Sequence, residues 1–547
     1  MRRVVALVRL GAARTRCAAT VFALGSALLL AACGGGHAAR SASVRRLGAT
    51  PAARAVDASL VLRVRDPAAL QRFLAALPGR HRFLSAATYG RRFGPTTAEL
   101  TRAQAVLRAA GLRVVASYPQ RTALRVRGPA GALDRLFSTR LVDYADAGGH
   151  RWHEPAGRPR VPAALSASVT AVADLNTRPD LRPLAVRAGG LTPADTATAY
   201  DIAPLQRQGF DGRGQTIAIV SFDAFTSSDL QAFDARFGIN SPPPERVPVR
   251  GGTSPGNQQA ETDLDVDVVR SIAPRAHILD YEAQNGVASL GDIVDRIVAD
   301  GRADIVSNSW GRCDLHNDPG RRAREEASFR AAAARWITVF AATGDQGAYD
   351  CQAADPTNQQ LSVDWPAASP NVIGVGGTRL SVRRDGSYLE EAGWEDVLAG
   401  QGGGGGVSTA EARPPWQAGP GVQNTDSNGH RQVPDVAGPA DPDSGFAVAA
   451  EGTFHQIGGT SAAAPFWAAS ALLIEGYARK HGVRSLAPLA PALYGLAASR
   501  PPFPAFHDVV RGGNRHFTAT RGWDYATGLG SPDVYGLARD LTARLGR

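Results

Sequence analysis

Lysine and methionine are almost absent from this sequence of 547 residues. It has one of each, Lys480 and Met1, so arginine supplies nearly all of the positive charge. That bias is typical of a GC-rich coding sequence, and the pI of about 9.9 is therefore poor evidence for nucleic-acid binding. After residue 33 no stretch is apolar for long enough to cross a bilayer as a helix. With 44% apolar and 20% charged residues, the composition excludes a disordered chain and predicts two or three globular domains.

The first 33 residues have the composition of an export signal. Several arginines precede the apolar run "CAATVFALGSALLLAAC", which ends in Leu30-Ala31-Ala32-Cys33 before three glycines. This ending resembles a bacterial lipoprotein signal, in which Cys33 becomes the lipidated N-terminus. Ordinary cleavage near the same alanines is the alternative and would leave Cys33 without a role. Both alternatives predict export to the cell envelope or the medium, and only lipidation predicts a membrane anchor.

Cysteine is scarce, with four residues in all. Cys17 and Cys33 fall in the signal, so Cys313 and Cys351 remain as an isolated pair. In an oxidising compartment such a pair predicts a disulfide, and a metal site is the weaker alternative because no histidine cluster lies nearby.

Charge is divided unevenly along the chain. Residues 191–547 contain 41 Asp and Glu against 30 Lys and Arg, a net charge of −11, whereas residues 1–190 contain 9 against 30, a net charge of +21. An arginine-rich leader beside an ordinary body is one explanation, but the leader holds only a few of those arginines. Two complementary surfaces that attract each other explain the division better.

Composition and pattern divide the chain into segments. Residues 34–56 are rich in Gly, Ala and Arg and predict a flexible, basic tether. Residues 57–177 mix strand patterns with three helix patterns, the first of them capped by Asp66, and predict a small α+β domain of the split-βαβ, ferredoxin-like kind. Residues 178–190, the end of a polar stretch with Pro and Gly that starts at 175, predict an exposed linker.

Residues 191–547 predict an α/β domain. Short apolar strands such as "QTIAIVSFD" and "ITVFAATGD" alternate with helix patterns, which is typical of a parallel sheet with helices on both faces. Sites in such sheets lie beyond the carboxyl ends of the strands. The segments "SNSWG" (307–311) and "ATGDQG", and the loop into Ser461, fall at those ends.

Ser461 stands at the start of a helix pattern, after two glycines, in "IGGTSAAAPFWAAS". By spacing alone it is better explained as a helix N-cap than as a nucleophile. The segment "GTSAAAP" also resembles the serine signature of subtilases in the broad sense. A serine nucleophile needs a base, and none of the eleven scattered histidines opens a helix after a strand in this half of the chain.

Two carboxylates replace histidine as the candidate base. Glu261 and Asp265 are four residues apart in a helix pattern, so both point to one face. A solvated acidic face is the alternative, but Leu264 and Val268 give this helix a buried side, and like charges at this spacing are unfavourable unless something uses them. A carboxyl pair that shares a proton titrates as a unit and can supply a base.

Asp345 follows a buried strand in "FAATGDQGAYDC". Taken alone it is more simply a turn residue. In its protonated form it would instead donate a hydrogen bond to the oxyanion of a tetrahedral intermediate.

Taken together, these residues resemble the sedolisin (serine-carboxyl peptidase) family, close to its kumamolisin branch. "SNSWG", "PAASPNVIGVGGT", "GGGGGVS" and "VPDVA" match further family segments over residues 57–540. The resemblance implies a subtilisin-like catalytic domain in which Ser461 is the nucleophile, Glu261 the general base and acid, Asp265 its orienting partner and Asp345 the oxyanion-hole acid. It also implies that residues 57–177 are an activation propeptide, which inhibits and helps to fold its own enzyme, and that 178–190 holds the processing site.

The C-terminal segments "FHDVVRGGN" and "TRGWDYATGLGSP" resemble the family's calcium site. The resemblance assigns one structural Ca²⁺ to the carboxylates of Asp508 and Asp524 and the main-chain carbonyls of Val509, Thr520 and Gly522. Carboxylates mixed with carbonyl oxygens suit this ion.

We therefore expect an exported, acid-acting endopeptidase that is made as a proenzyme, acts on proteins or peptides as a monomer, and binds no nucleic acid. Two alternatives remain. A lipoprotein that keeps the fold but only binds peptides would tolerate loss of a catalytic residue, yet all four are present. A histidine-dependent subtilisin-like protease is disfavoured by the missing histidine segment.

Overall fold

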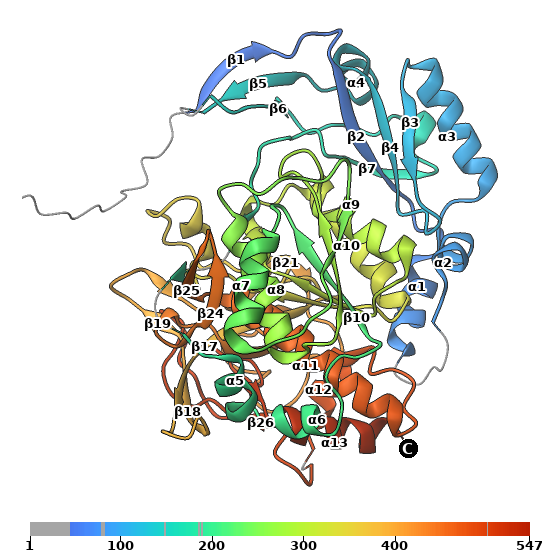
Figure 1. Cartoon of the computed structure of the whole chain (residues 1–547). Coiled ribbons are helices and arrows are strands. Elements are labelled where there is room, and N and C mark those ends of the chain that lie inside the picture. The colour runs from blue at the N-terminus through green and yellow to red at the C-terminus, as the bar shows by residue number, and fades with distance from the viewer. Residues whose placement is uncertain are drawn as a thin grey trace, which may run out of the picture. The chain divides into compact units, whose positions relative to one another are not determined.

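The computed structural model describes residues 44–77, 83–146, 149–183, 186–187, 190–499 and 501–546. The predicted signal, Cys33 and the first part of the predicted tether lie outside these ranges. The described chain forms an N-terminal domain that contacts a larger domain through two of its helices and one face of its sheet (Figure 1). Within these ranges no helix combines the length and the apolar character needed to cross a membrane.

The N-terminal domain is built on a four-stranded antiparallel sheet in the order β3-β4-β2-β7. This is the strand order of a ferredoxin-like fold and confirms the predicted mixed α/β domain. Asp66 caps the first helix by accepting a hydrogen bond from the Ala69 amide, and Thr96 forms a capping box with Glu99. The elements are β2 (Ala55–Leu62), α1 (Pro67–Ala75), α2 (Ala86–Phe93), α3 (Thr97–Ala109), β3 (Arg113–Ser117), β4 (Ala123–Pro129), α4 (Ala130–Phe137) and β7 (Val169–Ala173).

The flexible tether predicted for residues 34–56 is wrong for its described end. Residues Arg45–Ala49 form β1, which pairs antiparallel with β5 (Leu141–Ala145), and β5 pairs with β6 (Arg151–Pro155). The composition of this polar segment suggests flexibility, but its backbone is held in place by hydrogen bonds to β5. Such backbone pairing does not depend on the polarity of the side chains.

The larger domain contains an eight-stranded sheet in the order β11-β12-β10-β13-β15-β17-β18, with β23 also paired to β17. All pairs are parallel except β17 with β18, which confirms the predicted parallel sheet. The strands are β10 (Thr216–Ser221), β11 (Glu245–Pro248), β12 (His277–Glu282), β13 (Ile305–Asn308), β15 (Thr338–Ala342), β17 (Ile373–Val382), β18 (Tyr388–Gly393) and β23 (Val436–Pro439).

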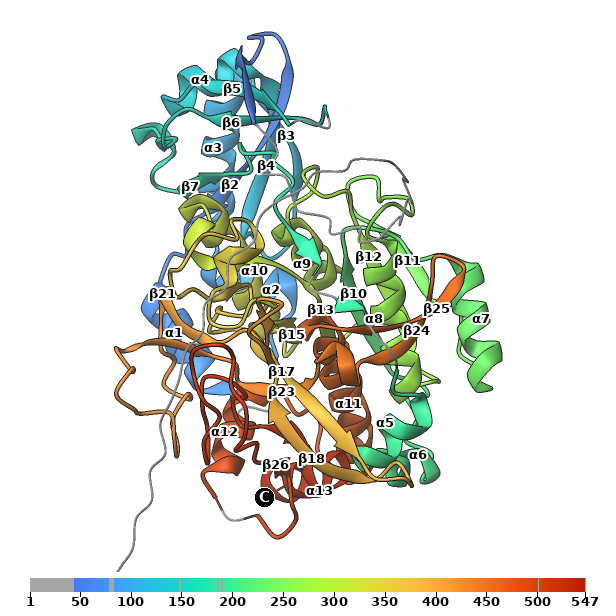
Figure 2. The same ribbon diagram turned by 90° about the vertical axis from the view of Figure 1, so that its left-hand side faces the viewer.

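Helices cover both faces of this sheet, as predicted (Figure 2). Apolar residues of α8 and α11 share one buried cluster with Ile219 and Ile278, and those of α9 and α10 share a second cluster with Val220 and Leu279 on the opposite face. The domain's helices are α5 (Pro193–Ala199), α6 (Ala203–Arg207), α7 (Ser227–Phe237), α8 (Gln259–Ile272), α9 (Leu290–Asp300), α10 (Pro319–Ala334), α11 (Thr460–Lys480), α12 (Leu489–Ala497) and α13 (Val534–Leu545).

The contact between the two domains has an apolar part and a charged part. Phe73, Tyr89 and Phe93 of the N-terminal domain lie in the same buried cluster as Ile293 and Phe329 of the larger domain. This part is independent of pH.

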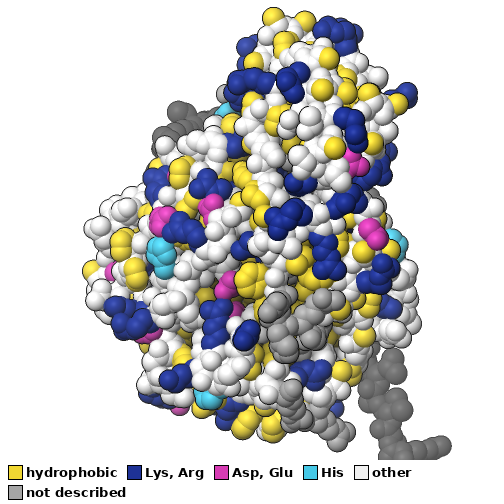
Figure 3. Space-filling view, turned by 90° about the vertical axis from the view of Figure 1, so that its right-hand side faces the viewer, with side chains coloured by type: hydrophobic (Ala, Val, Ile, Leu, Met, Phe, Trp, Pro, Cys, Tyr) yellow, Lys and Arg dark blue, Asp and Glu magenta, His cyan; other side chains and the backbone are white. Residues whose placement is uncertain are grey.

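Ion pairs form the charged part of the contact. The Arg250 guanidinium donates to the Asp57 carboxylate at 2.7 Å, and Arg125 lies 3.5 Å from Asp292. The Thr122 hydroxyl donates to Asp295 at 3.0 Å. Basic side chains are spread over the N-terminal domain at the top of Figure 3, where few acidic ones are visible. The Arg125–Asp292 pair has the predicted polarity, with the base on the N-terminal domain, whereas the Arg250–Asp57 pair has the reverse polarity.

Candidate active site

Ser461 is the second residue of α11, where the helix amides leave a positive end. Gly459 before it has φ +101°, a conformation that residues with a Cβ rarely adopt. Pro465 lies four residues further on and has no N–H, so the Ser461 carbonyl has no helical donor. That carbonyl instead accepts a hydrogen bond from the Ser309 hydroxyl at 3.1 Å, and the Ser461 hydroxyl donates to the Ser309 carbonyl at 3.3 Å.

Glu261 and Asp265 lie one turn apart on α8, and both are buried, with 2% and 0% of their surface exposed. The Ser309 hydroxyl donates to Asp265 Oδ1 at 2.6 Å, so Ser309 joins Asp265 to the Ser461 backbone. The predicted acidic face is therefore not solvated. It is packed against α11 and carries its carboxyls toward Ser461.

Burial and the adjacent Asp265 charge raise the pKa of Glu261 well above its ordinary value, a hydrogen bond from Ser461 lowers it, and Asp345 raises it further. The Ser461 hydroxyl therefore lies near the Glu261 carboxyl, although it donates its hydrogen bond to the Ser309 carbonyl. Neither carboxyl oxygen of Glu261 makes a hydrogen bond of normal geometry within the described residues. Such contacts are often long in a free enzyme and tighten in the complex with substrate.

Asp345 follows β15 and is 2% exposed. Its Oδ1 accepts hydrogen bonds from the Thr460 amide at 2.8 Å and the Thr460 hydroxyl at 2.9 Å, next to Ser461. Burial raises the pKa of Asp345 to about 7 although these two hydrogen bonds lower it. Its Oδ2 is buried and has no partner within the described residues. Below pH 7 this oxygen can carry a proton beside Ser461.

The glycine-rich segment at 402–406 packs under the turn that carries Asp345. The Gly404 amide donates to the Gly344 carbonyl at 2.8 Å, and the Gly402 amide donates to the Asp345 carbonyl at 2.9 Å. A Cβ at Gly404 would lie 1.7 Å from the Thr343 carbonyl oxygen. Only glycine allows this approach, so the run holds Asp345 in place.

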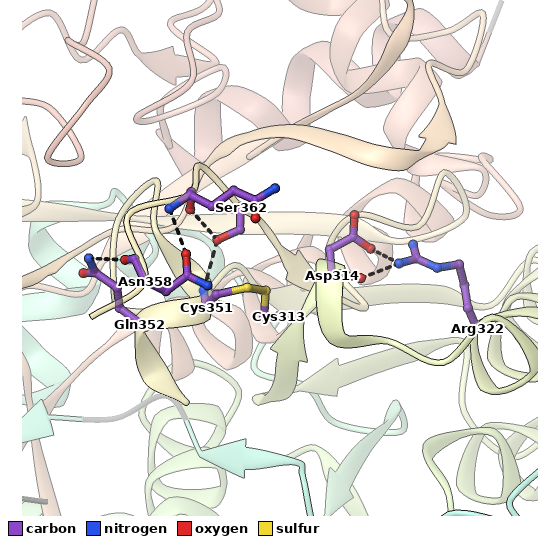
Figure 4. The surroundings of a disulfide bond; sticks show 8 residues. Cys313, Asp314, Arg322, Cys351, Gln352, Asn358 and Ser362 are labelled. Carbon is purple, nitrogen blue, oxygen red and sulfur yellow. Dashed lines mark hydrogen bonds and ion pairs between the residues drawn. A yellow bond between two sulfur atoms is a disulfide. The ribbon is translucent and has the colours of Figure 1, made fainter. Parts of the chain in front are cut away.

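The Cys313–Cys351 pair forms a disulfide in the structure (Figure 4). Cys313 ends β14 (Trp310–Cys313), which follows Ser309, and Cys351 lies six residues after Asp345. The bond therefore joins the segment next to Ser309 to the segment that carries Asp345.

The linker is not fully exposed, contrary to prediction. Leu181 is buried, and Arg182–Pro183 (β8) pairs antiparallel with β14, opposite Trp310 and Gly311. Val186–Arg187 (β9) pairs antiparallel with β25 (Thr453–Gly458), three residues before Ser461. The first pairing thus involves the strand that directly follows Ser309, and the second involves the strand that ends three residues before Ser461.

The predicted calcium ligands lie around one loop. The Gly522 amide donates to Asp508 Oδ1 at 3.1 Å, and the Thr520 amide donates to Asp524 Oδ2 at 2.8 Å. No described residue donates a hydrogen bond to the carbonyls of Val509, Thr520 or Gly522. Three carbonyls without donors beside the exposed carboxyl of Asp508 and the buried carboxyl of Asp524 fit the donor set that Ca²⁺ prefers.

Ser309 and Thr460 were missed as functional residues by reasoning from sequence. Both lie inside quoted segments, "SNSWG" and "GGTSAAAP". Their roles depend on contacts with Asp265 and Asp345, which lie far away in the chain. The absence of an N–H at Pro465 was the one local signal that the Ser461 carbonyl needs a donor from elsewhere.

Comparison with known proteins agrees with this architecture. Residues 42–178 match the sequence family described as "Pro-kumamolisin, activation domain", and residues 252–487 match the subtilase family. The chain is 36% identical to kumamolisin from Bacillus sp. (strain MN-32) over 440 residues, which cover 74% of this chain and 76% of that protein. It is 30% identical to sedolisin from Pseudomonas sp. (strain 101) over 520 residues, which cover 87% of this chain and 85% of that protein.

A solved structure of Pseudomonas sedolisin, described as a serine-carboxyl proteinase complexed with two molecules of pseudo-iodotyrostatin, superposes with a TM-score of 0.57 at 29% identity. The match covers 65% of this chain and 99% of that one. Fold and sequence together define a subtilisin-like peptidase preceded by an activation domain. The chain belongs to the sedolisin (serine-carboxyl peptidase) family and carries a propeptide of the kumamolisin type.

Proposed function

We propose that the protein is an exported endopeptidase that works in acid through Ser461, Glu261 and Asp265, with Asp345 as the oxyanion-hole acid. The observation that carries the proposal is the gathering of three buried carboxyls around the start of α11, where Ser309 links Asp265 to Ser461. His455, the histidine nearest to Ser461 in sequence, is half-buried on β25 opposite Val448.

The chemistry follows from these positions. Ser461 Oγ attacks the carbonyl carbon of the scissile peptide bond, and its proton passes to the Glu261 carboxylate. The protonated Asp345 donates a hydrogen bond to the oxyanion that forms. Glu261 then gives its proton to the leaving amine as the carbon–nitrogen bond breaks. Water attacks the resulting acyl-enzyme with Glu261 again as base, which releases the acid product and frees Ser461.

A base with a raised pKa works in acid because it belongs to a pair. Glu261 and Asp265 repel each other when both are ionised, so the pair loses its two protons in two separate steps. The first proton is lost at low pH, and the second is lost only at a higher pH. The singly ionised pair contains the base. Asp345 must keep its proton, and its pKa of about 7 allows this in acid. Both requirements are met between the first ionisation of the pair and pH 7.

We propose that maturation cuts the linker between Pro183 and Val186. The backbone pairs on either side of these positions lead to Ser309 and Ser461. On a precursor lipidated at Cys33, this cut would free the catalytic domain from the membrane because the lipid stays with the propeptide.

The test is incubation of the membrane-bound precursor at pH 4 and pH 7, with fragments read by mass spectrometry. At pH 4 we expect a mature N-terminus at residue 184, 185 or 186 and a soluble catalytic domain, and no cut in Ser461→Ala. A cut by Ser461→Ala would contradict the proposed nucleophile, and a mature enzyme that stays in the membrane fraction would contradict its proposed release from the membrane.

The same incubation tests whether ion pairs hold the propeptide. Burial raises the pKa of Asp57, but hydrogen bonds and charges from Arg127 and Arg125 lower it below its ordinary value. Both arginines belong to the propeptide, so this lowering does not depend on binding to the catalytic domain. It keeps Asp57 ionised, and therefore able to pair with Arg250, until the pH falls below 3.8. Asp57→Asn, which removes the pair with Arg250, should release the cut propeptide at higher pH. Asp143→Asn is the control, because Asp143 pairs with Arg54 inside the propeptide. Equal release by both variants would rule out this clamp.

We propose that Asp508, Val509, Thr520, Gly522 and Asp524 hold one structural Ca²⁺, which would neutralise the two carboxylates. Removal of the ion by a chelator should lower the melting temperature by about 5 °C. The reason is that free Ca²⁺ at about 100 times its Kd adds about 2.7 kcal/mol to the free energy of unfolding. Asp524→Asn should lose the response to calcium, and Asp533→Asn, in the helix cap next to the site, should keep it. A melting temperature that ignores calcium in the unmodified enzyme would refute the site.

A further inference from the structure

A further buried carboxyl, Asp280, lies on the sheet beneath the helix that carries Glu261 and Asp265. Asp280 belongs to β12, next to β10, and none of its surface is exposed. Its neighbours Leu279 and Tyr281 point to the cluster of α9, whereas Ile278 points to the cluster of α8. Because side chains alternate along a strand, Asp280 shares the α8 face with Ile278.

The Asp280 side chain is held at one oxygen and unpartnered at the other. The Ser221 hydroxyl, at the end of β10, donates to Asp280 Oδ1 at 2.5 Å. Asp280 Oδ2 is buried and has no hydrogen-bond partner within the described residues. The same holds for Asp265 Oδ2, although Asp265 Oδ1 accepts from Ser309. Asp265 on α8 and Asp280 on the sheet face that α8 covers thus each keep one buried oxygen without a partner among the described residues.

The two carboxyls interact. Burial is the largest effect on Asp265 and raises its pKa well above the ordinary value. The hydrogen bond from Ser309 lowers this pKa, and the charge of Asp280 raises it. Burial raises the pKa of Asp280 to about 7, the Ser221 hydrogen bond lowers it, Glu282 raises it, Arg246 lowers it and Asp263 raises it. In the acid range of the proposed function Asp280 therefore holds a proton, and a protonated carboxyl is a hydrogen-bond donor.

We propose that Asp280 is a positioning residue for the catalytic carboxyls: oriented by Ser221, it donates a hydrogen bond to Asp265 and stabilises the singly ionised Glu261–Asp265 pair. This extends the carboxyl chain from two members to three, Glu261, Asp265 and Asp280. A donor to the charged form lowers the pKa at which the pair takes up its second proton, so the base stays available in stronger acid. The inference rests on the proposed function of Glu261 and Asp265.

The test measures kcat and KM against pH for the mature enzyme and its Asp280 variants with a peptide substrate. Asp280→Val removes the donor and should move the acid limb of kcat/KM upward by about one to two pH units, with KM unchanged at the optimum. Asp280→Asn supplies an amide N–H in the same place and should leave the acid limb within about half a unit of the unmodified enzyme.

Stability separates this role from a packing role. Asp280→Val leaves the Ser221 hydroxyl without its acceptor. It is therefore compared with the double variant Ser221→Ala/Asp280→Val, in which that hydroxyl is also removed and which should melt no lower than the unmodified enzyme at pH 4. Asp263→Asn, on α8 but bonded to Gln259 and Thr226, is the control and should not move the limb. An unmoved limb in Asp280→Val, or equal shifts in Val and Asn, would overturn the proposal. Full activity without Glu261 would instead overturn the proposed function.

Discussion

Replacement of Glu261 by Gln should lower kcat about 10³- to 10⁴-fold with little change in KM, because the amide cannot take the proton of Ser461. Glu261 is buried, so no solvent base can easily replace it in the proposed proton transfer from Ser461. The measurement is steady-state hydrolysis of a peptide at pH 4. The variant should also fail to cut its own linker, so its mature form is prepared with a trace of active enzyme.

Asp263→Asn provides the matched control for this variant. Asp263 lies two residues away on α8, none of its surface is exposed, and burial raises its pKa to about 7, but it bonds to Gln259 and Thr226 instead of Ser461. Its kcat should stay within about threefold of the unmodified enzyme, since it takes no part in proton transfer. If both variants lose activity equally, disturbance of α8 and not loss of the base explains the result.

Replacement of Asp345 by Ala should lower kcat about 10²- to 10³-fold, the usual cost of removing one oxyanion-hole donor. The carboxyl donates only when protonated, and its pKa of about 7 places the loss of activity on the alkaline side. Rising pH should therefore inactivate the mature enzyme as Asp345 ionises. The measurement is the pH profile of kcat between pH 3 and pH 8.

Asp345→Asn distinguishes the proton from the shape of the side chain. The amide donates at every pH, so this variant should retain more activity than Asp345→Ala, and its alkaline limb should lie above that of the unmodified enzyme. An alkaline limb identical in the Asn variant and the unmodified enzyme would show that another group controls it.

Local pattern was sufficient to predict the frame of the site. Alternation of apolar strands and helices predicted the sheet that sets β15 and β13 side by side. The four-residue spacing predicted that Glu261 and Asp265 share one face of α8, and the structure shows both buried there. These features depend on neighbours within one or two turns, which a sequence displays directly.

Contacts between distant segments were not predictable. Whether the acidic face of α8 is solvated or buried depends on residues far away in the sequence. One of them is Ala449, whose amide donates a hydrogen bond to the Asp267 carboxyl at 3.0 Å. Ser309 and Asp280 reach Asp265 only through the order of strands in the sheet. Strand β1 was missed because its polar residues are ordered by backbone pairing with β5.

The central claim is that a carboxyl takes the place of histidine beside a serine nucleophile. A crystal structure of the mature enzyme at pH 4, with a peptide aldehyde bound, tests it most directly. The account predicts a bond between the aldehyde carbon and Ser461 Oγ, a Glu261 oxygen within about 3.2 Å of that Oγ, and Asp345 hydrogen-bonded to the former aldehyde oxygen. A histidine ring at the Ser461 hydroxyl, or Glu261 turned away from it, would contradict the account.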